Sequence, residues 1–187
     1  MKRRLFLAIP LDKRYLRACM RLRDAYGRIP YLRWTPLANL HVTVLFIGNV
    51  EEELVPPIRS SIEDRLREFE HFELRLDKVT YAPHHRPADM VWAKFHASDE
   101  FERLAELMRE AVTEVVAPPE QSHPELTPHI TLARFKRSVP KRPLYRLPKI
   151  GLEGSLFPVE SVVLFESRLR GAGAQYRPLM TFDAAAS

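Results

Sequence analysis

The chain of 187 residues has 45% hydrophobic and 28% charged residues and a formal net charge of +5, an ordinary composition for a globular protein with a sizeable core. Its single cysteine, Cys19, excludes an intramolecular disulfide and a cysteine-based zinc site, and we expect it to fill the core. No apolar run is long enough to span a bilayer, so a cytoplasmic protein is expected. The modest positive charge is compatible with a phosphate-bearing partner without requiring one.

A strand, a helix and two more strands are predicted in the first part of the chain. The apolar run at 4–9 predicts a buried strand that ends at Pro10. A signal peptide fits this run less well. A helix is expected from Asp12, as N-cap, to Tyr26, and its inner stripe would be Leu16, Cys19, Met20 and Tyr26. A short strand at 32–35 follows, and another runs from His41 until Gly48 and Asn49 close it.

Helices and strands are also predicted in the rest of the chain. A helix at 56–69, with its inner stripe at Ile58, Ile62, Leu66 and Phe69, leads to strands at 72–81 and 90–97, joined by a basic turn at 82–87. Ser98 is expected to cap a third helix with a stripe of Phe101, Leu104, Met108, Ala111, Val112 and Val115. A strand from His129, a basic loop at 136–149 and a strand pair at 159–169 and 176–182 complete the chain.

Two of the predicted strands carry the same pattern. The first begins His41-Val42-Thr43-Val44 and the second His129-Ile130-Thr131-Leu132. Side chains alternate between the faces of a strand, so each copy presents an imidazole and a hydroxyl on one face and apolar residues on the other. With 7 His and 7 Thr, about 0.26 His-x-Thr matches are expected by chance (7 × 7 / 187), so the duplicated pattern is a strong signal.

The placement of the two copies suggests an internal duplication. Their histidines are 88 residues apart, nearly half the chain, and each motif strand follows a strand and a helix. A pseudo-two-fold axis between such halves would bring the two motif strands face to face across a groove. The alternative is that each histidine is a hydrogen-bonded structural residue of its strand.

Two histidines in one groove suit proton transfer at neutral pH. An unperturbed imidazole titrates near 6.5, so a neutral ring can accept a proton while a charged ring donates one. In-line attack on a phosphodiester needs such a pair, and threonine hydroxyls can donate to the phosphoryl oxygens. Neither a metal nor another cofactor is required by this chemistry. His84 and His85 could suggest a metal site, but solvated side chains in a turn are the simpler interpretation.

The motifs and their flanks resemble a known family. The paired motifs, the opening Arg4-Leu5-Phe6-Leu7-Ala8-Ile9 and the Arg33-Trp34 approach to Asn39-Leu40-His41 are similar to those of two-histidine (2H) phosphoesterases, in particular the RNA 2′,3′-cyclic phosphodiesterase (2′-5′ RNA ligase) family. The resemblance implies a bilobal α+β fold, with two antiparallel sheets around a central cleft and helices outside. It also implies metal-independent hydrolysis of RNA 2′,3′-cyclic phosphate ends to 2′-phosphates.

The resemblance also implies roles for five residues. His41 would be the general acid and His129 the general base, while Thr43, Thr131 and Arg134 would bind the phosphate. Strict alternation puts Arg134 on the face opposite His129, so only a bulge near Ala133 would place it on the same face. The alternative is that Arg134 is a solvated or structural arginine.

Two aromatic residues and one loop are further candidates for RNA contacts. Phe46 alternates away from His41, so core packing is expected for it, whereas Trp34 is undecided between stacking on a base and packing. The loop at 136–149 would either follow an RNA backbone or be an ordinary solvated loop.

The alternatives to this function are reversible 2′-5′ joining of RNA, cyclic-phosphate hydrolysis on a small nucleotide, and non-catalytic binding of RNA ends. We expect residues 1–187 to form one bilobal domain that acts as a monomer. Its partners would be RNA ends or nucleotides that bear a 2′,3′-cyclic phosphate, with no membrane partner.

Overall fold

The computed structural model describes residues 1–29, 31–67, 69–82, 88–117, 127–136, 149–171 and 173–184. Two features predicted from the sequence lie outside this part of the chain: the pair His84 and His85, and almost all of the basic loop at 136–149.

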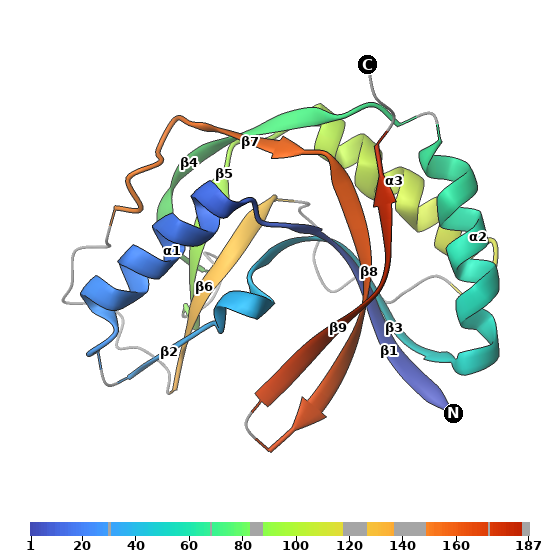
Figure 1. Cartoon of the computed structure of the whole chain (residues 1–187), viewed down its shortest axis with the longest axis horizontal. Helices are drawn as coiled ribbons and strands as arrows, with labels where there is room; N and C mark the ends of the chain where they lie inside the picture. The colour runs from blue at the N-terminus through green and yellow to red at the C-terminus, as the bar shows by residue number, and fades with distance from the viewer. Residues whose placement is uncertain are drawn as a thin grey trace.

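The described residues form the elements of Figure 1 in the order β1 (Lys2–Pro10), α1 (Lys13–Tyr26), β2 (Leu32–Trp34), η1 (Leu37–Asn39), β3 (His41–Glu51), η2 (Glu52–Leu54), α2 (Val55–Leu66), β4 (Phe72–Ala82), β5 (Met90–Phe95), α3 (Asp99–Thr113), β6 (His129–Phe135), β7 (Leu156–Val159), β8 (Ser161–Arg170) and β9 (Gly173–Asp183). Three helices and eight strands lie where the sequence predicts them. Strand β7 was not predicted, and β3 continues beyond Gly48, whose positive φ of 89° lets the strand bend without ending.

Side-chain caps begin two of the helices, as predicted. The Asp12 carboxylate accepts a hydrogen bond from the Tyr15 N–H at 2.7 Å, and the Ser98 hydroxyl accepts one from the Phe101 N–H at 3.2 Å. The predicted stripe of α1 is partly wrong, because the side chains of Met20 and Tyr26 are each 38% exposed. The buried face consists instead of Tyr15, Ala18, Cys19 and Leu22.

The strands form one continuous antiparallel path, in the order β7-β4-β5-β6-β3-β1-β8-β9, and β2 also pairs with β6. Figure 1 shows the sheet curled, with α1 on one side and α2 and α3 on the other. This α+β, antiparallel fold was predicted. Its halves, β7-β4-β5-β6 and β3-β1-β8-β9, are joined by a single residue pair, Val42 with Ile130. The two motif strands are therefore neighbours in the sheet and do not face each other across a groove.

Each half contains a strand–helix–strand unit whose helix covers the other half. Helix α1 follows β1, but its Tyr15 ring lies 6.1 Å from Phe95 on β5 and 4.9 Å from Phe157 on β7. Helix α3 follows β5, but packs against β3 and α2. Buried residues of both halves belong to one core cluster, so the two halves support each other. None of the helices in the described part of the chain is long and apolar enough to cross a membrane.

Candidate active site

The two motifs have the same alternation of buried and exposed side chains. Val42 and Val44 on β3 are 0% and 2% exposed, and Ile130 and Leu132 on β6 are 0% and 2% exposed. The histidine and threonine of each motif are partly exposed between them. The prediction that each pair shares one face of its strand is confirmed.

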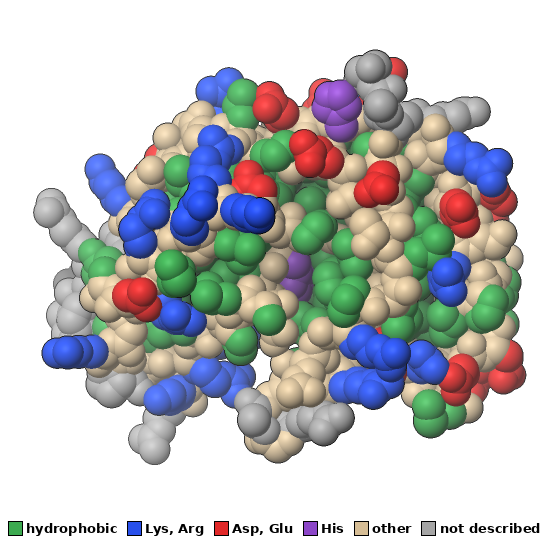
Figure 2. Space-filling model, in the orientation of Figure 1, with side chains coloured by type: hydrophobic (Ala, Val, Ile, Leu, Met, Phe, Trp, Pro, Cys, Tyr) green, Lys and Arg blue, Asp and Glu red, His purple; other side chains and the backbone are tan. Residues whose placement is uncertain are grey.

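The pairing of Val42 with Ile130 brings the two motifs together. Extending this antiparallel register by one residue on each side puts His41 beside Thr131 and Thr43 beside His129. Each histidine therefore neighbours the threonine of the other motif, around the point where the two halves join. Figure 2 shows a histidine in a hollow at the centre of one face, among hydrophobic side chains, with Lys and Arg on two sides.

Both imidazoles are oriented by a backbone carbonyl two residues upstream. Nδ1 of His41 lies 2.8 Å from the Asn39 oxygen, and Nδ1 of His129 lies 2.8 Å from the Thr127 oxygen. A carbonyl oxygen only accepts, so Nδ1 carries the proton in both rings and Nε2 is the nitrogen that can exchange one. The Asn39 side chain donates to the Ala174 oxygen on β9 at 2.8 Å, which fixes the segment that holds His41.

Aromatic side chains surround His41. The ring centroids of Phe6 and Tyr176 lie 5.1 and 5.4 Å from the imidazole. Burial lowers the pKa of His41 below its ordinary value of 6.5, although the hydrogen bond to Asn39 acts in the opposite direction. Nε2 of His41 lies 3.0 Å from the Thr43 hydroxyl, which donates to it when the ring is neutral.

His129 has different surroundings. The Trp92 ring on β5 stacks on its imidazole, with 3.7 Å between centroids and 17° between planes. Lys94, two residues further on, is the direct partner of His129 in the β5–β6 register. Neither contact follows from the sequence, since alternation along β5 does not reveal which of its faces lies beside the histidine of β6.

A bulge in β6 brings Arg134 to the face of His129. The register with β5 shifts between Val91 and Trp92, which leaves Leu132 as an extra residue, and the consecutive residues Leu132 and Ala133 are both buried. Alternation restarts after the bulge, so the exposed Arg134 shares a face with His129 and Thr131. Its Nη1 lies 3.0 Å from the Met90 sulfur on β5. This is the bulge that the sequence analysis required for Arg134 to face the site.

A matching bulge in β3 corrects the expectation for Phe46. The register of β3 with β1 shifts between Leu7 and Ala8, which leaves Val44 as an extra residue at the same position of its motif. Phe46 consequently lies on the face of His41, 52% exposed, with its ring 6.1 Å from Phe6. The prediction of core packing for Phe46 is wrong, because it assumed uninterrupted alternation.

Trp34 does not share this face. It pairs with the buried Ala133 and packs, partly buried, against the core. The next residue, Thr35, is linked to the β6 bulge: its N–H donates to the Leu132 oxygen at 2.9 Å and its hydroxyl to the Thr131 oxygen at 2.7 Å.

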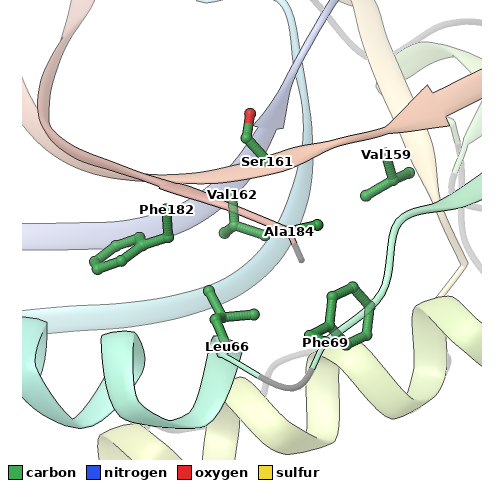
Figure 3. A pocket seen from close by; sticks show the side chains of 7 residues that line it. All are labelled: Leu66, Phe69, Val159, Ser161, Val162, Phe182 and Ala184. Carbon is green, nitrogen blue, oxygen red and sulfur yellow. The ribbon is translucent and has the colours of Figure 1, made fainter. Parts of the chain in front are cut away.

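A small apolar pocket elsewhere offers no chemistry. Figure 3 shows that it lies between the end of α2 and strands β7 to β9, and that its lining includes Leu66, Val162 and Phe182. No ionisable side chain lines it. In the part of the chain that the structure describes, no three His, Cys, Asp or Glu side chains gather as metal ligands. The two histidines with their threonines therefore remain the candidate catalytic group.

Known proteins are similar to this chain in sequence and in fold. A curated relative from Thermus thermophilus, named RNA 2′,3′-cyclic phosphodiesterase, is 34% identical over 96% of this chain and 89% of its own length. A protein of the same name from Methanothermobacter thermautotrophicus is 28% identical over 97% and 99%. The crystal structure of TT0787, also from T. thermophilus, superposes with a TM-score of 0.82 at 30% identity, covering 96% of this chain and 97% of that one. E. coli LigT complexed with 3′-AMP shares the fold, with a TM-score of 0.80 at 24% identity and full coverage of both chains (100% each).

The curled antiparallel sheet with paired His-x-Thr strands is the architecture of a two-histidine phosphoesterase. The model of the 2′-5′ RNA ligase superfamily matches residues 12–170. The chain belongs to this superfamily, as its motifs suggested.

Proposed function

We propose that the chain is an enzyme that hydrolyses RNA 2′,3′-cyclic phosphate ends to 2′-phosphates without a metal, with residues 1–187 acting as one domain. The observation that carries this proposal is the matched orientation of two imidazoles at the junction of the halves: each holds its Nδ1 proton on a backbone carbonyl and keeps Nε2 for proton transfer. The names of the curated relatives support the same reaction. We expect the enzyme to be a cytoplasmic monomer. Both histidines come from one chain, so the proposed site needs no second copy.

The reaction needs one proton accepted and one donated. His129 takes a proton from water through Nε2 as the water oxygen attacks phosphorus, and a new P–O bond forms. The bond between phosphorus and O3′ breaks, and His41 donates its Nε2 proton to the leaving O3′. The products are a 2′-phosphomonoester and a 3′-hydroxyl, and the two rings recover their starting states by proton exchange with water.

The remaining site residues bind the substrate. Thr43 and Thr131 donate to the non-bridging phosphoryl oxygens, and the Arg134 guanidinium offsets the charge that gathers on them in the transition state. The exposed Phe46 ring offers a surface on which the terminal base stacks.

Family resemblance assigns the acid role to His41 and the base role to His129, and substrate binding accounts for the charged form of His41 that an acid needs. Burial favours the neutral form of the His41 ring. A bound phosphodiester brings a negative charge beside this ring, which favours the imidazolium that an acid must start from. The pKa of His41 thus rises when substrate binds, and protonation is coupled to binding.

The test is phosphorus NMR on a short RNA with a 2′,3′-cyclic phosphate end. The His41→Ala and His129→Ala variants should each lose roughly 10²- to 10⁴-fold in rate, the usual contribution of an acid or base, while EDTA leaves the wild type unaffected. His96→Ala is the matched control, because the His96 side chain is exposed. Full activity in either site variant would overturn the proposal, and inhibition by EDTA would overturn its metal-independent form.

A substrate whose leaving group departs without a proton separates the two roles. A nucleoside p-nitrophenyl phosphate should restore much of the lost rate to His41→Ala and little to His129→Ala. The reverse pattern would exchange the acid and the base.

A further inference from the structure

Two arginines lie directly opposite each other beside the proposed site. In the antiparallel pairing of β2 with β6, Arg33 is the partner of Arg134. Both are exposed, and no carboxylate in the described part of the chain forms an ion pair with either. Like charges directly opposite on neighbouring strands destabilise a sheet, so this pairing has a cost that a bound anion would relieve.

The arginines share the face that carries the histidines. Residues paired directly across an antiparallel sheet project to the same side. Leu32 and Trp34, the neighbours of Arg33, both pack against the core, which directs Arg33 to the opposite face. Arg134 lies on this face because of the β6 bulge, and its guanidinium contacts Met90 on the far side from β2. The order across the sheet is therefore Met90, Arg134, Arg33.

The number of cations exceeds what one phosphodiester requires. A cyclic phosphate carries one negative charge, and Arg134 already serves it in the proposed reaction. Arg33 lies one strand further from Trp92 than Arg134 does. A cyclic mononucleotide has no second phosphate that could reach Arg33. An RNA chain has one, in the linkage to the preceding nucleotide, and a guanidinium suits its two oxygens.

We propose that Arg33 binds this upstream phosphate, and that the enzyme therefore prefers the ends of RNA chains to cyclic mononucleotides as substrates. This inference rests on the proposed function and adds to it a residue that binds the substrate beyond its cyclic phosphate.

The experiment compares a 2′,3′-cyclic mononucleotide with a dinucleotide that has the same end. The wild type should have a higher kcat/KM on the dinucleotide than on the mononucleotide. Arg33→Gln should lower kcat/KM on the dinucleotide roughly tenfold, mainly by raising KM, and should lower it far less on the mononucleotide. The salt dependence of log kcat/KM for the dinucleotide should become shallower by about 0.7. Arg17→Gln, which removes an exposed arginine on α1, is the matched control and should change neither substrate.

A second substrate, with a neutral methylphosphonate in place of the linking phosphate, tests whether Arg33 and this phosphate interact directly. It should lower the wild-type rate by the same factor as Arg33→Gln and have no further effect in that variant. An equal effect of Arg33→Gln on both substrates, or none on either, would overturn the role of Arg33 and leave the hydrolase intact. A wild-type enzyme that cleaves neither substrate would instead overturn the proposed function.

Discussion

At the scale of single residues, two histidines in matching motifs acquire unequal properties from their neighbours. Both histidines donate Nδ1–H to a carbonyl two residues upstream, a contact made within each motif's own segment. The rings around them come from distant strands: Phe6 and Tyr176 at His41, and Trp92 at His129. Burial lowers the pKa of His41. Unequal surroundings of this kind are what the two different proton-transfer roles proposed for the histidines require.

The lowered pKa of His41 predicts a pH-dependent stability. Below pH 6.5 the unfolded chain binds a proton at His41 that the folded protein resists, so the free energy of unfolding falls as the pH drops from 6.5 through the lowered folded pKa. His41→Asn should weaken this dependence in urea titrations between pH 7.5 and 5, whereas His96→Asn, at an exposed position, should preserve it. An unchanged pH dependence in His41→Asn would contradict the effect of burial.

At the scale of elements, matching bulges shape the site. The extra residue falls at Val44 in β3 and at Leu132 in β6, the fourth position of each motif. Each bulge turns the residue five places after the histidine onto the site face: an aromatic ring in one half, Phe46, and a guanidinium in the other, Arg134. In the proposed reaction, the ring of one half stacks on a base and the guanidinium of the other half binds phosphate.

Thr35 tests the importance of the β6 bulge. Thr35→Val removes the hydroxyl that donates to the Thr131 oxygen, and it should cost about 1 kcal/mol of unfolding free energy together with a fall in kcat/KM as Arg134 loses its position. Thr113→Val removes a similar bond, to the Glu110 oxygen, at the exposed end of α3. This control should cost less than about 0.5 kcal/mol and leave activity unchanged. Equal activity in both variants would show that the bulge does not depend on Thr35.

At the scale of the whole molecule, the two halves are joined more by their helices than by their strands. Only Val42 and Ile130 pair between β3 and β6, while α1 and α3 each leave one half and pack on the other. A site made from one histidine of each half needs the two halves to keep a fixed position relative to each other. The crossed helices supply it through the shared core.

This arrangement predicts cooperative unfolding. Leu104, fully buried on α3, supports the half that contains β3, whereas both tryptophans lie in the other half, on β2 and β5. Leu104→Ala should cost about 2–5 kcal/mol and shift tryptophan fluorescence and far-ultraviolet circular dichroism to the same lower urea midpoint. Met20→Ala, on the exposed side of α1, should shift neither by more than about 0.5 kcal/mol. A fluorescence midpoint that stays at the wild-type value in Leu104→Ala would mean that the halves unfold separately.

Local sequence patterns account for the helices and their caps, most of the strands, and the shared face of histidine and threonine in each motif. These follow from periods of 3.6 and 2 residues and from capping chemistry that acts within a few residues. Tertiary structure alone decided that the motif strands are neighbours, that Trp92 stacks on His129, and that Phe46 and Arg134 face the site. Register and bulges arise from pairing between strands far apart in the chain, and one extra residue reverses every face that alternation predicts beyond it.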